Sequence, residues 1–237
     1  MRVFLLSCLT LISSEALAGR GIPGPYVTEG KSTFTTDAFF DFDEEASNQL
    51  FRQRFTLDSG VTDQLSLRFR VNFNDPAGDN LEFDRFEIGG KYELAEKGEW
   101  PVDVGLYLTY IGDSGSNTEF LQSRILLAKD LDDYQLTSNI QVEREIGAGE
   151  SNSDSTLSFN VAGLYKIDSV SKVGFDYFGN YGELNDLSNF NDNQHLFGPT
   201  YVHKLESAGI TLFTSGLFGL TDESPDFSLE WGINFSF

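Results

Sequence analysis

Large apolar residues recur at every second position along most of this chain. The clearest example is the segment DFSLEWGINFSF, whose large apolar residues share one parity: Phe227, Leu229, Trp231, Ile233, Phe235 and Phe237. The residues between them are small or polar. Because successive side chains of a β-strand point to opposite faces, this alternation predicts a strand with one apolar and one polar face.

Earlier segments repeat the pattern. It is regular over residues 34–42, 51–57, 65–73, 86–94, 102–110, 121–127, 136–142, 157–167 and 173–181, and less clean near 195–204 and 210–220. With the last segment this predicts about twelve strands, within a range of 10–14. The connections are short and rich in turn residues, as in NDPAGDN and GDSGSN. No segment has a helical period and no linker divides the chain, so we expect one all-β domain of antiparallel strands.

The first residues, MRVFLLSCLTLISSEALA, predict a secretory signal peptide over 1–18, which leaves 19–237 for the all-β domain. Arg2 supplies the positive start, and Ala16-Leu17-Ala18 is a small-residue cleavage site. The apolar run is too short for a helix across a bilayer core of about 30 Å. Cleavage before Cys8, as in a lipoprotein, is the alternative. The Gly-rich stretch GRGIPGP at 19–25 is interpreted as a flexible entry to the first strand.

Size indicates which way the apolar faces point. The interior of a barrel of about eight strands is already just filled by side chains, so twelve strands would enclose an apolar space too wide to pack. The apolar faces are therefore expected to face lipid, and a soluble two-sheet sandwich is the alternative. Aromatic residues expected at strand ends favour the membrane barrel, as an interfacial girdle: Tyr92, Trp100, Tyr110, Tyr134, Tyr165, Tyr181, Trp231 and Phe237.

The last segment resembles the terminal strand of Gram-negative outer-membrane β-barrel proteins, which commonly ends in Phe after alternating apolar residues. The stretches HLFGPT and LFGLTDESPDFSLEWGINFSF are also similar to a poorly characterised group of proteobacterial porin-like barrels. The resemblance implies a transmembrane β-barrel in the bacterial outer membrane with both termini in the periplasm. It further implies that lipid and lipopolysaccharide surround the protein, and that the barrel-assembly machinery reads the six apolar residues from Phe227 to Phe237. It implies no particular oligomeric state.

The opposite parity would face the lumen. Basic residues on it are Arg52, Arg54, Arg68, Arg70, Arg85, Lys91 and Arg124. These cannot face lipid, because an Arg at the bilayer midplane costs about 2–4 kcal/mol. Acids on the same parity outnumber them: Asp37, Asp41, Glu87, Glu93, Asp103, Glu143, Glu145, Asp176 and Glu230.

Two interpretations of this polar interior stay open. Charged rings set the selectivity of pores, so the arginines could line a small passive channel for small polar or anionic solutes. Small twelve-stranded oligosaccharide-type porins have similar basic lumens. Alternatively, acids and bases neutralise one another and plug the barrel, which then has a structural or binding role.

Charge and motifs exclude other functions. With 37 acidic and 16 basic residues the formal net charge is −21, which excludes general nucleic-acid binding. No cofactor is predicted; loop carboxylates that bind Ca²⁺ or Mg²⁺ are a weak alternative. No enzyme is predicted either. A hydrolase at the rim would depend on His195 near Asp186 and Asp192, and a histidine hydrogen-bonded to the loop is the simpler interpretation.

Overall fold

The structure, a computed structural model, describes residues 22–43, 50–76, 80–113, 119–146 and 155–237. The predicted signal peptide, and with it the domain boundary, lies outside these residues. The long strands are β1 (Ser32–Phe42), β2 (Leu50–Gly60), β3 (Leu65–Pro76), β4 (Glu82–Glu93), β5 (Asp103–Asp113), β6 (Glu119–Leu131), β7 (Tyr134–Ile146), β8 (Ser155–Lys166), β9 (Ser171–Glu183), β11 (His195–Leu205), β12 (Ile210–Gly219) and β13 (Phe227–Ser236). The two-residue strand β10 (Asp186–Leu187) pairs only with β9.

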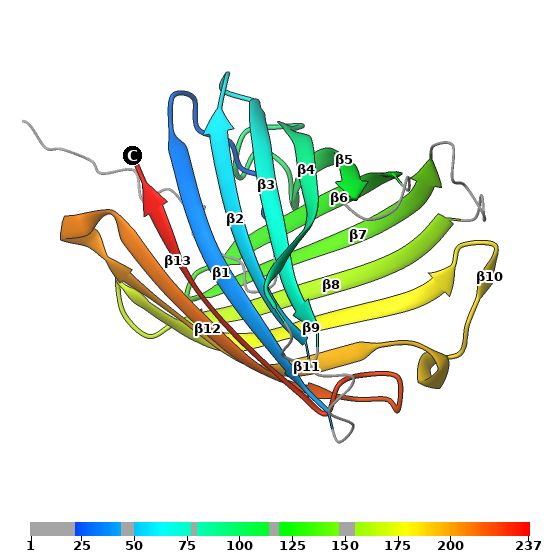
Figure 1. Cartoon of the computed structure of the whole chain (residues 1–237). Helices are drawn as coiled ribbons and strands as arrows, with labels where there is room; N and C mark the ends of the chain where they lie inside the picture. Colours follow the sequence, from blue (N-terminus) through cyan, green and yellow to red (C-terminus); the bar gives the residue numbers. More distant parts are fainter. Residues whose placement is uncertain (1–21, 44–49, 77–79, 114–118, 147–154) are drawn as a thin grey trace, which may run out of the picture.

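These strands form one closed antiparallel barrel (Figure 1). Each long strand pairs with its neighbours in sequence, apart from the short β10, and β13 pairs with β1 to close the sheet. Of the 13 strands in the sheet over the described residues, twelve build the barrel once β10 is set aside. The predicted twelve-stranded, all-β barrel is therefore confirmed.

The seam between the first and last strands is continuous. Its register runs from Thr33 opposite Ser236 to Phe42 opposite Phe227. Beyond that ladder, Ser32 and Phe237 exchange two backbone hydrogen bonds of 2.9 Å each. The regular alternation of the last segment thus belongs to the strand that closes the barrel and leaves no free edge.

Apolar side chains cover the outer face. On β5, Leu106 and Leu108 are 47% and 53% exposed, whereas Tyr107 and Thr109 between them are buried inside. On β13, Leu229 and Trp231 are exposed while Ser228 and Glu230 are buried. An apolar exterior on every side of a closed barrel is the surface that a lipid environment requires.

Side-chain exposure also shows which residues face outward in the two less regular segments, 195–204 and 210–220. On β11, Phe197 and Tyr201 are exposed, whereas Leu196 and Val202 are buried inside. On β12, Leu212 and Phe218 face outward, and Phe213 and Leu217 face inward. Both strands carry some large apolar residues on each face, which is why their alternation was unclear in the sequence.

Two predictions about the strands were wrong in detail. Trp231 was assigned to a girdle at a strand end, but it lies in the middle of β13, opposite Ala38. The strand predicted from residue 86 begins at Glu82, because the register with β3 shifts between Asn72 and Phe73. Asn72 faces Arg85 and Phe73 faces Phe83. A β-bulge of this kind interrupts the period of two.

The two ends of the barrel differ. At the end that carries the C-terminus, most connections are short, although residues 94–102 between β4 and β5 form a longer one. The shortest joins β6 and β7 through Asp132 and Asp133, and Asp132 adopts a φ of 47°. Positive φ suits two-residue hairpins, and Asp tolerates it. At the other end, the connections include 184–194 and 220–226. No helix among the described residues is long and apolar enough to cross a membrane.

The outward face yields a test of the barrel's orientation. Replacing Leu108, in the middle of β5, with Arg should lower the free energy of unfolding in lipid vesicles by about 2–4 kcal/mol, because the charge would enter the hydrocarbon core. Leu187→Arg on β10 is the matched control and should cost about 0–1 kcal/mol, because this exposed residue lies beyond the barrel strands. Urea unfolding followed by tryptophan fluorescence measures both. Equal losses would contradict a lipid-facing β5.

Candidate lumen site

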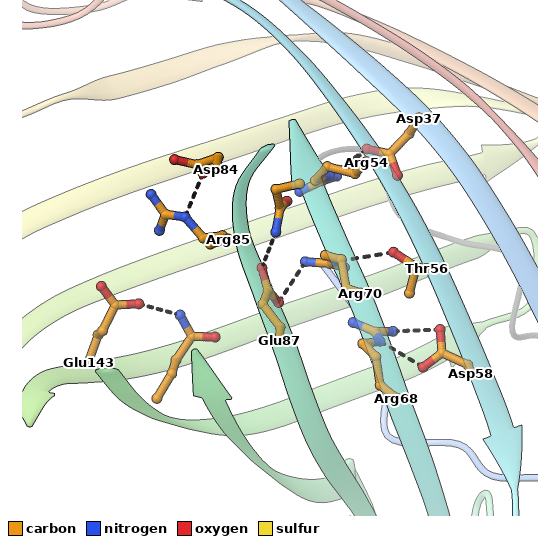
Figure 2. A network of polar contacts seen from close by, with 12 residues as sticks. Asp37, Arg54, Thr56, Asp58, Arg68, Arg70, Asp84, Arg85, Glu87 and Glu143 are labelled. Atoms are coloured by element: carbon orange, nitrogen blue, oxygen red, sulfur yellow. Dashed lines mark hydrogen bonds and ion pairs between the residues drawn. The ribbon is translucent and has the colours of Figure 1, made fainter. Parts of the chain in front are cut away.

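An arginine cluster lies on the inner face of β2 and β3 (Figure 2). Pairing of these adjacent strands puts four of the predicted lumen residues on the same inner wall: Arg52, Arg54, Arg68 and Arg70. Arg54 and Arg70 are 9% and 7% exposed. Their neighbours along each strand, such as Phe55 and Phe69, are exposed on the outside.

Most of these arginines are paired with carboxylates. Arg54 Nε and Nη2 each lie 2.6 Å from Asp37 Oδ2, and Glu230 Oε1 lies 3.7 Å from Arg54 Nη2. Arg68 donates from Nε and Nη2 to both oxygens of Asp58, at 2.7 and 3.1 Å. A two-point contact of this kind fixes the guanidinium plane.

Arg70 joins a wider network. Its Nη1 lies 3.2 Å from Glu87 Oε2, and its Nε donates to Thr56 Oγ1 at 2.9 Å. The other oxygen of Glu87 accepts a hydrogen bond from Asn72 Nδ2 at 3.1 Å. Both oxygens of this buried carboxylate are therefore engaged on the wall.

The remaining predicted residues have different surroundings. Arg85 Nε donates to the adjacent Asp84 at 2.7 Å, and Arg52 Nε donates to Asn74 Oδ1 at 3.0 Å. Lys91 Nζ donates to the backbone carbonyls of Gly24 and Tyr26. The guanidinium carbon of Arg124 lies 5.4 Å from the centre of the Tyr107 ring.

The N-terminal segment enters the barrel, which corrects its interpretation as a flexible entry. Within 22–25, Ile22 is fully buried and Pro23 O accepts a hydrogen bond from Asn139 Nδ2 on β7 at 3.0 Å, with the amide oriented to satisfy both its groups. Pro25 packs against Gly105, where a side chain on β5 would collide with the proline ring. The residues Gly19, Arg20 and Gly21 of that prediction lie outside the described part of the chain.

Two further contacts hold this segment. The Tyr26 hydroxyl donates to Asp103 Oδ2 at 2.8 Å, and the backbone N–H of Val27 donates to Glu93 Oε2 at 2.7 Å. Burial, followed by the hydrogen bond to Asp103, raises the pKa of the Tyr26 hydroxyl well above its ordinary value. The phenol therefore stays a donor over the physiological pH range. The pattern Gly-Ile-Pro-Gly-Pro-Tyr gave no periodic signal, so sequence reasoning missed this role.

The opposite wall is partly apolar. Leu164, Val202 and Phe213 form a buried cluster on the inner faces of β8, β11 and β12. Nearby, Ser215 Oγ lies 2.9 Å from both Asp176 Oδ2 and Thr200 Oγ1. Inward-pointing apolar residues on apolar-rich strands could not be separated from outward ones by period alone.

A cavity of about 100 Å³ remains between the N-terminal segment and the arginine cluster. Among the described residues, the charged side chains that line it are four cations and two carboxylates: Arg54, Arg68, Arg70, Lys91, Asp37 and Asp58. Although acids outnumber bases over the whole inner parity, the reverse holds at this cavity. Arg52, Arg85 and Arg124 do not border it. A space of this size holds several waters or a small solute.

His195 does not pair with Asp186 or Asp192, as the hydrolase alternative would require. It lies on the exposed face of β11 that also carries Phe197, yet its ring is fully buried because Phe190 stacks on it at 3.9 Å. Its Nδ1 lies 2.8 Å from the Tyr177 hydroxyl, and no described carboxylate contacts it. Its backbone N–H and C=O bond to Ser224, so the histidine secures the loop.

No group of three or more metal-ligating side chains is close enough to hold a metal ion in the part of the chain that the structure describes. The weak prediction of Ca²⁺ or Mg²⁺ concerns outward loops, of which 44–48, 77–79, 114–118 and 147–154 lie outside that part. It stays a prediction.

Solved structures of small outer-membrane channels share this fold. The COG4313 outer membrane channel from Pseudomonas putida F1 matches with a TM-score of 0.67 and 14% identity, over 91% of this chain and 99% of that one. The NanC porin matches at 0.62 and 12%, over 85% and 98%. The KdgM porin, in complex with disordered oligogalacturonate, matches at 0.58 and 9%, over 87% and 99%. No protein-family model and no curated protein matches by sequence. The chain therefore has the fold of small porin-like outer-membrane barrels.

The buried pairs can be tested by a mutant cycle. Asp37→Asn should lower the free energy of unfolding by about 1–3 kcal/mol, because Arg54 loses its short charged contact while staying buried. Adding Arg54→Gln should recover part of that loss. Asp84→Asn is the control and should cost less than about 1 kcal/mol, because the Arg85 pair is more exposed. Strictly additive losses at Asp37 and Arg54 would show that the pair is not coupled.

Proposed function

We propose that this protein is a small passive channel of the bacterial outer membrane, which admits small polar or anionic solutes past an arginine-rich wall. The observation that carries the proposal is the cavity inside the closed barrel, with its four cations and two carboxylates. The fold shared with outer-membrane channels is consistent with this role.

The ion pairs fix the orientation of the arginine side chains, but the cations at the cavity still outnumber the carboxylates. Arg68 uses Nε and Nη2 for Asp58, which leaves its Nη1 group for other acceptors. Lys91 Nζ donates to the carbonyl oxygens of Gly24 and Tyr26, which fix the ammonium group at the edge of the cavity. An anion near these groups meets fixed donors in a space of low dielectric, where charge interactions are stronger than in water.

A plugged barrel is the second candidate, and the N-terminal segment favours it. Residues 22–27 are held by Asp103, Glu93 and Asn139 from three different strands. The apolar cluster narrows the lumen from the other side. The two candidates differ in whether solutes pass beside this segment or only after it moves.

The surroundings belong to the same proposal. Outer-membrane lipid and lipopolysaccharide would contact the apolar exterior. The barrel-assembly machinery would recognise β13, whose apolar residues Leu229 and Trp231 are exposed on that exterior.

Selectivity tests the channel. Purified protein in planar bilayers should give single-channel steps, with a reversal potential in a KCl gradient that indicates anion preference. Replacing Arg52, Arg54, Arg68 and Arg70 together with Ser should move that potential toward cation preference. A thermal melt by circular dichroism confirms that the variant is folded. Absence of steps from the wild type, or an unchanged reversal potential in the folded variant, would overturn the proposal.

Removing residues 19–26 of the mature chain separates the two candidates. The deletion removes the Tyr26–Asp103 contact and the buried Ile22, so single-channel conductance should rise. Tyr26→Phe is the control, because it keeps the ring and removes only the hydroxyl; its conductance should stay near that of the wild type. Steps from the deletion variant alone would identify the N-terminal segment as a plug. Equal conductance in all three proteins would show that the segment does not narrow the path.

A further inference from the structure

Arg124, on the inner face of β6, differs from the ion-paired arginines Arg54, Arg68 and Arg70. Across the β-ladder, Arg54 lies opposite Asp37, Arg68 opposite Asp58, and Arg70 opposite Glu87. The residues opposite Arg124 are Tyr107 on β5 and Gln141 on β7. Among the described residues Arg124 forms no ion pair, and its buried Nε has no hydrogen-bond partner.

Other polar groups next to Arg124 lack partners as well. Tyr107 and Thr109 are 4% and 1% exposed, and neither the Tyr107 hydroxyl nor Thr109 Oγ1 makes a hydrogen bond with a described residue. Both oxygens lie within 3 Å of the position that a Cβ on Gly89 would take. Gly89 therefore leaves room for two hydroxyl donors to approach each other beside the guanidinium.

Buried donors without acceptors are costly, at about 1–3 kcal/mol each. The carboxylate within electrostatic range, Glu87, is already engaged by Arg70 and Asn72. Gln122 adds an acceptor, Oε1, which also lacks a partner and does not help to hold an anion. The described part of the chain therefore supplies no acceptor for Arg124, Tyr107 and Thr109, and a negatively charged acceptor from solution would complete them.

We propose that Arg124, Tyr107 and Thr109 form a binding subsite for the carboxylate of a small monoanion in the lumen. The inference rests on the proposed channel function and names its solute class. A guanidinium group matches a carboxylate in shape, and two hydroxyl groups can each donate to its oxygens. One unpaired cation next to the charge of Glu87 favours a single negative charge over two.

The lumen gives access to this subsite. Arg124 is only partly buried, and it lies on the inner face of β6, because Leu121 and Ile125 on the other parity are exposed on the outside. Arg68, which lines the cavity, approaches the same Tyr107 ring at 5.2 Å from its centre. The subsite therefore adjoins the cavity on the arginine wall.

Acetate is the probe for this subsite. In planar bilayers, replacing chloride by acetate at constant ionic strength should reduce the wild-type current with a measurable half-blocking concentration. Arg124→Gln should raise that concentration by about 10-fold or more, since a hydrogen bond to a charged group is lost. Tyr107→Phe and Thr109→Val should each raise it by about 2- to 10-fold. Lys204→Gln, which removes the same charge at the far end of β11, should leave it unchanged.

A second readout does not need conduction. Acetate should raise the melting temperature of the purified wild-type barrel in detergent, and this shift should be lost in Arg124→Gln and retained in Lys204→Gln. If the wild type conducts but acetate acts equally on it and on Arg124→Gln in both assays, the subsite is overturned and the channel stands. If the wild type does not conduct yet shows the Arg124-dependent shift, the channel fails and the subsite stands.

Discussion

Closure of the backbone ladder is the constraint on which the rest of this structure depends. Within hydrocarbon no water is available to satisfy peptide groups, so every strand needs a partner on both sides. The seam from Ser32 and Phe237 through Phe42 and Phe227 supplies the last of these pairings. Once the ring is closed, the parity of each strand fixes which side chains meet lipid. A slip of one residue would send Glu230 outward and Trp231 into the lumen.

The closed ring creates a second problem, because twelve strands enclose more space than their inner side chains fill. Different parts of the lumen are filled by different kinds of side chain. One wall carries an apolar cluster around Phe213, and the other carries ion-paired arginines. The segment from Ile22 to Tyr26 lies between these walls, where Ile22 and Tyr26 are buried and Tyr26 bonds to Asp103. The cavity is the part of the lumen that these groups leave unfilled. Its lining is mainly cationic because it lies against the arginine wall.

The sequence predicted most of the barrel because lipid acts on every strand in the same way. One apolar face per strand is a repeated requirement, and it appears as a period of two in segments such as β13. The prediction from a period of two failed where apolar residues also lay on the inner face of a strand. Leu196 and Phe197 are both apolar for different reasons, one packing inside and one facing out. The interior has no such repeat, so the insertion of Pro23 and Pro25 left no periodic trace.

The candidate site shows the same division. Inward parity could be predicted for each arginine, but its partner depends on register, which one strand alone does not specify. Directly opposite side chains are the units of interaction across a sheet. Register gives Arg54, Arg68 and Arg70 an acid each, and gives Arg124 a tyrosine. Arg124 therefore has no carboxylate opposite it among the described residues, even in a chain with a net charge of −21. Local pairing, and not total charge, decides what such a lumen can bind.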